Sequence, residues 1–97
     1  MLSSKQRSNL RSLASNIEVI AQVGKLGVND NQIKSLSDAL EARELIKIRV
    51  LLNNDEEVDD IGRELSNKLK AEFVASTGRT IVLYKKSSRK DFKHIEF

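Results

Sequence analysis

Two glycines, Gly24 and Gly27, enclose Lys25 and Leu26 in the stretch VGKLGVND (residues 23–30). Glycine adopts backbone conformations that other residues avoid, and without a Cβ atom it permits close approach. A helix that begins after such a loop presents unpaired N–H groups and a partial positive charge, which together bind phosphate. The stretch matches neither the G-x-x-x-x-G-K-[ST] of ATP-binding loops nor the G-x-G-x-x-G of dinucleotide folds. It therefore indicates either a plain turn or a clamp on a nucleic-acid backbone, as in single-strand-binding domains with a G-x-x-G loop.

Side chains able to catalyse a reaction or to hold a metal ion are scarce in this chain. It has no cysteine, which excludes a thiolate metal site and a disulfide framework, and its only histidine is His94, near the C-terminal end. Five acidic residues stand between positions 55 and 60, at an expected helix start where they interact favourably with the helix dipole. Their spacing fits no EF-hand loop. We therefore expect a protein that is not an enzyme and that has no metal or other cofactor.

Charges are unevenly distributed along the 97 residues, a length that predicts a single domain. Residues 1–49 hold eight lysines and arginines against five acidic residues, residues 50–70 hold three against six, and residues 71–97 hold six against three. Basic ends favour phosphate binding, although a solvated surface with chance clustering would give the same counts. No apolar run approaches the ~20 residues of a membrane span, and the start has no signal-like apolar block. We expect a cytoplasmic protein without a membrane partner.

Apolar periodicity and capping residues divide the chain into seven expected elements, in the order helix, strand, helix, strand, helix, strand, strand. Ser3 with Gln6 fits a capping box for the first helix, and Asn29 or Asp30 can cap the second. The expected elements cover residues 3–14, 17–23, 30–44, 45–52, 55–69, 72–76 and 80–86. This order predicts an α+β fold, a two-layer α/β domain with the helices packed on a four-stranded mixed sheet.

The apolar residues of these elements fall on single faces, which identifies an expected core. In the strands they alternate with polar residues, so that positions 17, 19, 21 and 23, and positions 46, 48, 50 and 52, each face one way. Lys47 and Arg49 face the other way. The helical stripes consist of Leu10, Leu13 and Ala14, of Ile33, Leu36, Ala39 and Leu40, and of Val58, Ile61, Leu65 and Leu69.

Four segments in a fixed order carry a resemblance to a known family. They are KQRSNLRSLA (5–14), VGKLGV (23–28), ALEARELIKIRV (39–50) and GRTIVLYKK (78–86). With them, residues 2–86 resemble the bacterial YhbY-like proteins, the stand-alone form of the CRM (chloroplast RNA splicing and ribosome maturation) domain. The resemblance implies an RNA-binding domain, similar in fold to the C-terminal domain of translation initiation factor three, that is associated with precursors of the large ribosomal subunit. One departure is Lys70, which replaces a small residue, so the turn after the third helix could differ.

The family's glycine loop maps onto Gly24, Lys25, Leu26 and Gly27, and we expect basic residues elsewhere to add RNA contacts. One tyrosine and three phenylalanines cannot form a broad stacking platform, so we expect backbone and phosphate contacts to dominate and Tyr84 to pack. The expected basic contacts are Lys5, Arg7 and Arg11 in the first helix, Lys34 in the second, Arg79 in the hairpin turn, and Lys85 and Lys86 after the last strand.

The expected domain comprises residues 1–86, and residues 87–97 form a basic tail that is either loose or docked through Phe92, Ile95 or Phe97. We expect a monomer whose partner is ribosomal RNA or the precursor of the large subunit. The alternative is a protein-interaction module or translation-associated adaptor that uses the acidic third helix. Such a module would not require the basic ends or the glycine loop.

Overall fold

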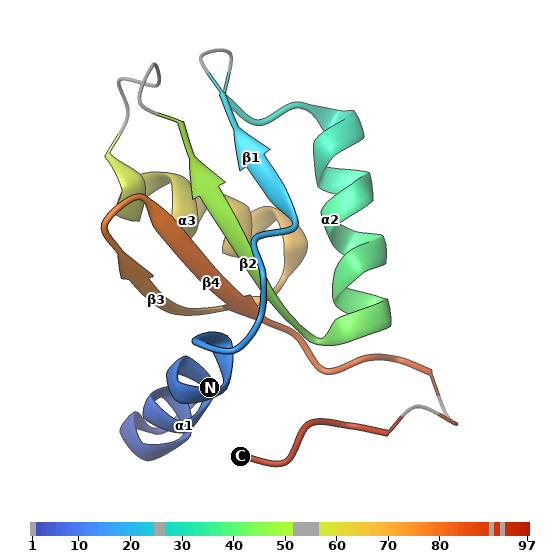
Figure 1. Ribbon diagram of the computed structural model, residues 1–97. Coiled ribbons are helices and arrows are strands. Elements are labelled where there is room, and N and C mark those ends of the chain that lie inside the picture. Colours follow the sequence, from blue (N-terminus) through green and yellow to red (C-terminus); the bar gives the residue numbers. More distant parts are fainter. Residues whose placement is uncertain (1, 25–26, 52–56, 90, 92) are drawn as a thin grey trace.

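Seven elements build a four-stranded sheet with helices packed on it in the computed structural model of the chain (Figure 1). The structure describes residues 2–24, 27–51, 57–89, 91 and 93–97. The elements are α1 (Ser4–Ala14), β1 (Ala21–Val23), α2 (Asp30–Arg43), β2 (Leu45–Val50), α3 (Val58–Leu69), β3 (Glu72–Thr77) and β4 (Thr80–Tyr84). Their order is the predicted one, and the predicted α+β class is confirmed.

The sheet is mixed and has the strand order β1-β2-β4-β3. β1 and β2 are parallel, with α2 as the crossover that parallel neighbours require, and β4 is antiparallel to both β2 and β3. The C-terminal ends of β1 and β2 therefore lie at the same end of the sheet as the turn between β3 and β4. We call this end the loop end, because the glycine loop follows β1 there (Figure 1).

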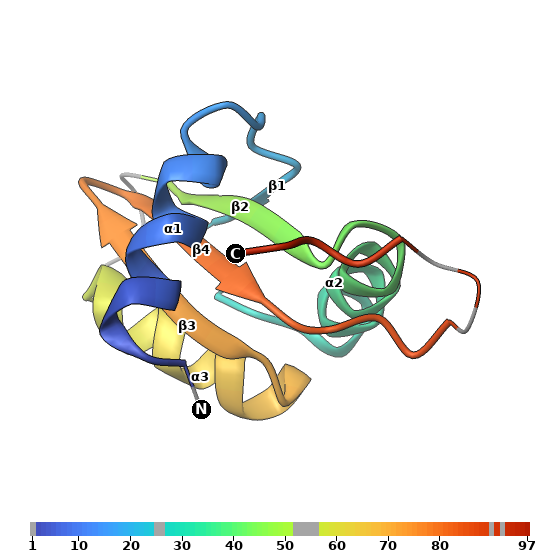
Figure 2. The same cartoon turned by 90° about the horizontal axis from the view of Figure 1, so that it is seen from below.

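Each face of the sheet carries its own apolar cluster. On one face α2 and α3 pack, and the buried residues are Val23, Leu36, Leu40, Ile46, Ile48, Val50, Ile61, Leu65, Leu69, Ile81 and Leu83. On the other face Leu10 and Ala14 of α1 pack against residues that include Leu45, Val82 and Tyr84 (Figure 2). Helices therefore cover both faces of the sheet, with α2 and α3 on one face and α1 on the other. Leu13, expected in the stripe of α1, is instead 39% exposed.

The first strand is shorter than predicted, because the chain changes sides before it joins the sheet. Residues 17–20 lie outside β1, which begins at Ala21. Ile17 packs in the cluster of α1, whereas Ile20 packs in the cluster of α2 and α3. Pairing with β2 starts where the Ile20 N–H donates to the carbonyl of Lys47, at 3.0 Å. The prediction that residues 17–23 form one strand with a single buried face was therefore wrong for residues 17–20.

Local sequence explains where the helices begin and end. The predicted capping box is confirmed, since the Gln6 N–H donates to Ser3 Oγ at 3.1 Å and the Ser3 N–H donates to Gln6 Oε1 at 3.0 Å. Asn29 caps α2, accepting from the Gln32 N–H at 2.8 Å. Lys70 ends α3 in the left-handed conformation, with φ of 54°. The departure noted at this position therefore coincides with a helix C-cap.

The C-terminal segment returns to the sheet face that α1 covers (Figures 1 and 2). Ile95 and Phe97 pack on that cluster, and the Phe97 ring meets the Tyr84 ring edge-on with centroids 4.9 Å apart. Docking through these two residues, one of the two expected arrangements, is thus observed, while Phe92 lies outside the described residues. The domain boundary after residue 86 stays a prediction.

A buried carboxylate holds this segment in place. Glu44, at the C-terminal end of α2, is 0% exposed and has a φ of 64°, which few residues other than glycine adopt. Its Oε2 accepts from the Ser87 N–H at 2.7 Å and lies 2.5 Å from His94 Nδ1, and its Oε1 accepts from the Ile95 N–H at 2.8 Å. His94, near the C-terminal end, is therefore held against the domain by Glu44.

Candidate nucleic-acid interface

The glycine loop directly follows the C-terminal end of β1, at the loop end of the sheet. Gly24 and Gly27 form an isolated bridge, in which the Gly27 N–H donates to the Gly24 carbonyl at 3.0 Å. Gly27 has a φ of +75°, which side chains with a Cβ rarely adopt, and the space around its missing Cβ is open. Glycine is needed at this position for its backbone conformation. The predicted contacts Lys25 and Leu26 lie outside the described residues.

The strand that leads into the glycine loop, β1, is braced from two sides. The Leu51 N–H donates to the carbonyl of Val23 at 2.9 Å, which ties the chain after β2 to the last residue of β1. The Gln32 side chain donates to the Gln22 carbonyl at 2.6 Å, which ties α2 to the same strand. The segment after β2 and helix α2 therefore fix where the glycine loop leaves the sheet.

The N-terminus of α2 is partly satisfied from within. Asn29 accepts the Gln32 N–H, and Asp30 places a negative charge in the first turn of the helix. The cap satisfies one of the N–H groups and the carboxylate partly neutralises the positive end of the helix dipole. The N-terminus of α2 alone is therefore a weaker anion site than the sequence indicated.

Arg79 is tied to the backbone at the loop end. Its Nε donates to the Val50 carbonyl at 3.0 Å and its Nη2 to the Leu51 carbonyl at 2.8 Å, while its own carbonyl accepts from the Val50 N–H at 2.7 Å. The guanidinium thus holds the β3–β4 turn against the end of β2. It also brings a positive charge to the end of the sheet where the glycine loop lies.

The other predicted contacts are spread over the molecule. Lys5 and Arg7 are exposed on α1, and Lys34 is exposed on α2. Lys85 follows β4 at the end of the sheet opposite the loop end, where its Nζ donates to the Leu69 carbonyl at 3.2 Å. Lys86 is exposed next to it. The fold therefore divides the predicted residues between two ends of the sheet, and their roles stay predictions.

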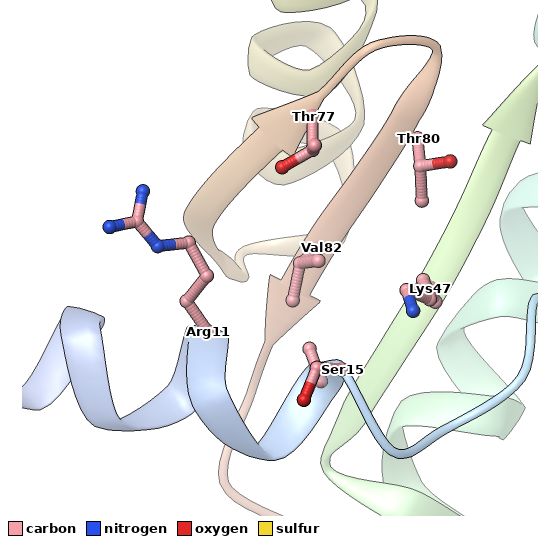
Figure 3. A pocket seen from close by; sticks show the side chains of 7 residues that line it. Arg11, Ser15, Lys47, Thr77, Thr80 and Val82 are labelled. Atoms are coloured by element: carbon pink, nitrogen blue, oxygen red, sulfur yellow. The ribbon is translucent and has the colours of Figure 1, made fainter.

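Two basic residues that the sequence did not assign to the site lie on the sheet face that α1 partly covers. Lys47 and Arg49 alternate with core residues along β2, as predicted, and Arg49 is exposed. Lys47 donates from Nζ to the Ile17 carbonyl at 3.2 Å. The alternation in LIKIRV fixed the face on which they lie, but only the packing of α1 brings Arg11 to the same face (Figure 3).

Tyr84 is a packing residue, as expected. It is 7% exposed, and its burial, together with the negative charge of Glu44, raises the pKa of its phenol. Its ring meets the Phe97 ring edge-on and is not presented to a base.

The described residues include no group of three histidine or acidic side chains placed to hold a metal ion. Among the helices in those residues, none has the length and apolar character that crossing a membrane requires.

Fold and site together define a small α+β domain in which a glycine loop follows a short, braced strand beside basic side chains. The family model of the CRS1 / YhbY (CRM) domain matches residues 2–85. The chain belongs to this family, as the resemblance in its sequence predicted.

Individual relatives cover almost the whole chain. The chain is 50% identical over 96 residues to the "Probable RNA-binding protein YqeI" of Bacillus subtilis, covering 99% of this chain and 98% of that protein. It is 30% identical over 86 residues to an "RNA-binding protein" of Haemophilus influenzae, covering 89% and 87%. Its structure is similar to the solution structure of the hypothetical protein SAV1595 from Staphylococcus aureus, with a TM-score of 0.80, 45% identity, and 94% and 95% of the two chains covered.

Proposed function

We propose that this protein binds RNA, through the glycine loop and the basic residues around it, and that it acts without catalysing a reaction. The observation that carries the proposal is the match over nearly the full length to the relative named "Probable RNA-binding protein YqeI". The geometry supports it, because Gly27 requires glycine for its backbone and Arg79 brings a positive charge to the same end of the sheet. Contacts to phosphates and to the shape of the RNA would then supply most of the affinity.

The target we propose is ribosomal RNA, in the precursor of the large subunit, where the protein would serve as an assembly factor. What supports this finer proposal is the resemblance of the four sequence segments to the YhbY-like proteins. We also propose that the protein acts as a monomer in the cytoplasm. Crosslinking in cells followed by sequencing of the bound RNA, with sedimentation of the purified protein, tests the target and the monomeric state.

Replacing Lys25 by glutamate tests the glycine loop as the contact. Reversing a charge at a phosphate contact removes an attraction and adds a repulsion, so we expect RNA affinity to decrease roughly five- to thirty-fold, the equivalent of about 1–2 kcal/mol. The melting temperature should change little, because a surface charge usually alters stability by no more than about 0.5 kcal/mol. The measurement is a titration with structured ribosomal RNA at fixed salt.

Lys68→Glu is the matched control, because it makes the same change of charge on α3, where Lys68 forms an exposed ion pair with Glu64. Equal losses for both variants would mean that net charge alone sets the affinity. Unchanged binding by Lys25→Glu would remove the loop from the site. A purified protein that carries no nucleic acid and binds none at low salt would favour the alternative, an adaptor that uses α3.

A further inference from the structure

A cleft lies on the sheet face that α1 partly covers, between the C-terminal half of this helix and the β3–β4 hairpin. Its volume is about 280 Å³. Figure 3 shows Arg11 and Ser15 on the α1 side, Thr77 and Thr80 on the hairpin, and Lys47 on β2, across from Arg11. The volume is near the lower limit of ligand pockets, which hold roughly 300–1,000 Å³, so the cleft suits one nucleotide-sized group.

The charge of the cleft is positive and uncompensated. Arg11 and Lys47 contribute two cations from opposite sides, and the ion pairs found among the described residues, Asp60–Arg63, Glu64–Lys68 and Glu44–His94, involve neither of them. Lys47 is oriented by its bond to the Ile17 carbonyl, a neutral group, so its charge remains available. Two cations on opposite walls of a small cleft favour an anion, and the phosphodiester is the anion that RNA supplies.

Hydroxyl groups form the rest of the polar lining. Thr77 and Thr80 each contribute a hydroxyl group, which can donate and accept hydrogen bonds. Ser15 donates its hydroxyl to the Ser12 carbonyl at 2.7 Å and so presents only acceptor lone pairs. Donors and acceptors together match a sugar hydroxyl, which is itself a donor and an acceptor. Ala14 and Val82 add apolar surface on which a sugar ring can lie.

We propose that this cleft binds one ribose–phosphate unit of the RNA, with Arg11 and Lys47 at the phosphate and Thr80 at the 2′-hydroxyl. The cleft would then select RNA over DNA, a task that phosphate contacts alone cannot perform. The inference rests on the proposed function, since it assumes that the protein binds RNA. It adds a second place of contact, apart from the glycine loop, and assigns the discrimination between sugars to it.

The test compares binding of oligouridine and oligodeoxyuridine of equal length to the full chain, by fluorescence anisotropy at fixed salt. Wild-type protein should bind the RNA more tightly. Thr80→Val keeps the shape and the β-branch of the side chain but removes the hydroxyl, so it should weaken RNA binding roughly three- to ten-fold, the value of one hydrogen bond. DNA binding should change less than about two-fold, so the preference for RNA is reduced or lost. Ser8→Ala is the control, because it removes an exposed hydroxyl from α1 outside the cleft.

Arg11→Gln should weaken RNA and DNA binding by similar factors, because both ligands carry the phosphate. Equal wild-type affinity for the two ligands, or an unchanged RNA preference in Thr80→Val, would overturn the sugar-selecting cleft while leaving RNA binding intact. If Thr80→Val does not fold, as judged by its circular dichroism, Thr80→Ala, which also removes the hydroxyl, is measured in the same way with the same criteria. A wild-type protein that binds neither ligand, nor structured ribosomal RNA, would instead overturn the proposed function, and the inference with it.

Discussion

Replacing Glu44 by glutamine would show how strongly the C-terminal segment is held on the domain. The carboxylate is fully buried and accepts from three nitrogen groups, those of Ser87, His94 and Ile95, at 2.7, 2.5 and 2.8 Å. Glutamine has nearly the same size, but its NH₂ group cannot accept a hydrogen bond. In either orientation of the amide, at least one buried N–H group therefore faces another donor.

The cost follows from these contacts. A hydrogen bond to a charged group contributes roughly 1.5–3 kcal/mol, and a buried donor left without a partner costs about 1–3 kcal/mol. One bond is lost and the remaining bonds lose their charge, so we expect a decrease of about 2–4 kcal/mol in the free energy of unfolding at neutral pH. In a domain of this size each kcal/mol corresponds to roughly 4–8 °C, so the melting temperature should decrease by roughly 10–30 °C.

The pH dependence gives this prediction a second, independent readout. Burial raises the pKa of Glu44, but the hydrogen bonds from His94, Ile95 and Ser87 and the charge of His94 outweigh it and hold the pKa below the ordinary value of 4.5. Above 4.5 the stabilisation is fully present, and it is lost as the pH falls through the lowered pKa of the folded state, because the unfolded chain binds the proton more readily. Glutamine does not titrate, so the difference in stability between wild type and variant should narrow in acid.

Urea unfolding followed by circular dichroism, at neutral pH and at several acidic values, measures both effects. Glu41→Gln is the comparison, because Glu41 also accepts hydrogen bonds from the segment, from the Ser88 N–H at 3.0 Å and its hydroxyl at 2.8 Å, but at the surface. Water can replace those bonds, so this variant should lose much less stability. Equal stability of Glu44→Gln and wild type at neutral pH, or a difference that stays constant in acid, would refute the account of Glu44 as the anchor.

Two further substitutions test the packing on the two faces of the sheet. Phe97→Ala removes the edge-on ring contact and part of the cover of the second face, and should lower the free energy of unfolding by about 1–2 kcal/mol in the same urea experiment; an unchanged value would mean that the docked segment adds no stability. Gly62→Ala should also destabilise, because a Cβ there would clash with the ring of Phe73, and overpacking of about 1–3 kcal/mol exceeds the gain of about 1 kcal/mol in helix propensity. A more stable variant would show that the ring moves aside freely.

The parts of the fold that were predictable are those that depend on local sequence. The capping box of Ser3 and Gln6 and the stripe of Ile61, Leu65 and Leu69 both arise from residues three or four positions apart. The alternation along β2 likewise depends on neighbouring residues, and it placed Ile46 and Ile48 in the core. These features can be predicted without knowledge of the tertiary structure, because the geometry of a helix or a strand determines which of its own residues share a face.

The parts that escaped prediction depend on contacts between distant segments. Residues 17–20 alternate as a strand would, yet the chain there passes from one face of the sheet to the other, and no local pattern marks such a crossing. Glu44 looks like an ordinary polar residue at a helix end, and its burial depends on groups that follow it by 43 to 51 positions. Arg11 was predicted to be a phosphate contact, but the cleft that it shares with Lys47 was not, because that cleft also forms only where distant segments meet.

The two proposed contact sites, the cleft and the glycine loop, lie along the same segment of the chain. From Lys47 on β2, in the cleft, the chain extends to Leu51, just after the strand, whose side chain would be 3.7 Å from a Cβ on Gly24, at the glycine loop. Four residues of extended strand cover roughly 13 Å, and exposed Arg49 lies between the two sites. The acidic first turn of α3, with Asp59 and Asp60, belongs to the helix packed on the opposite face of the sheet. A single RNA strand that follows β2 could therefore contact both sites without passing that acidic turn, and substitutions in the loop and in the cleft should each weaken its binding.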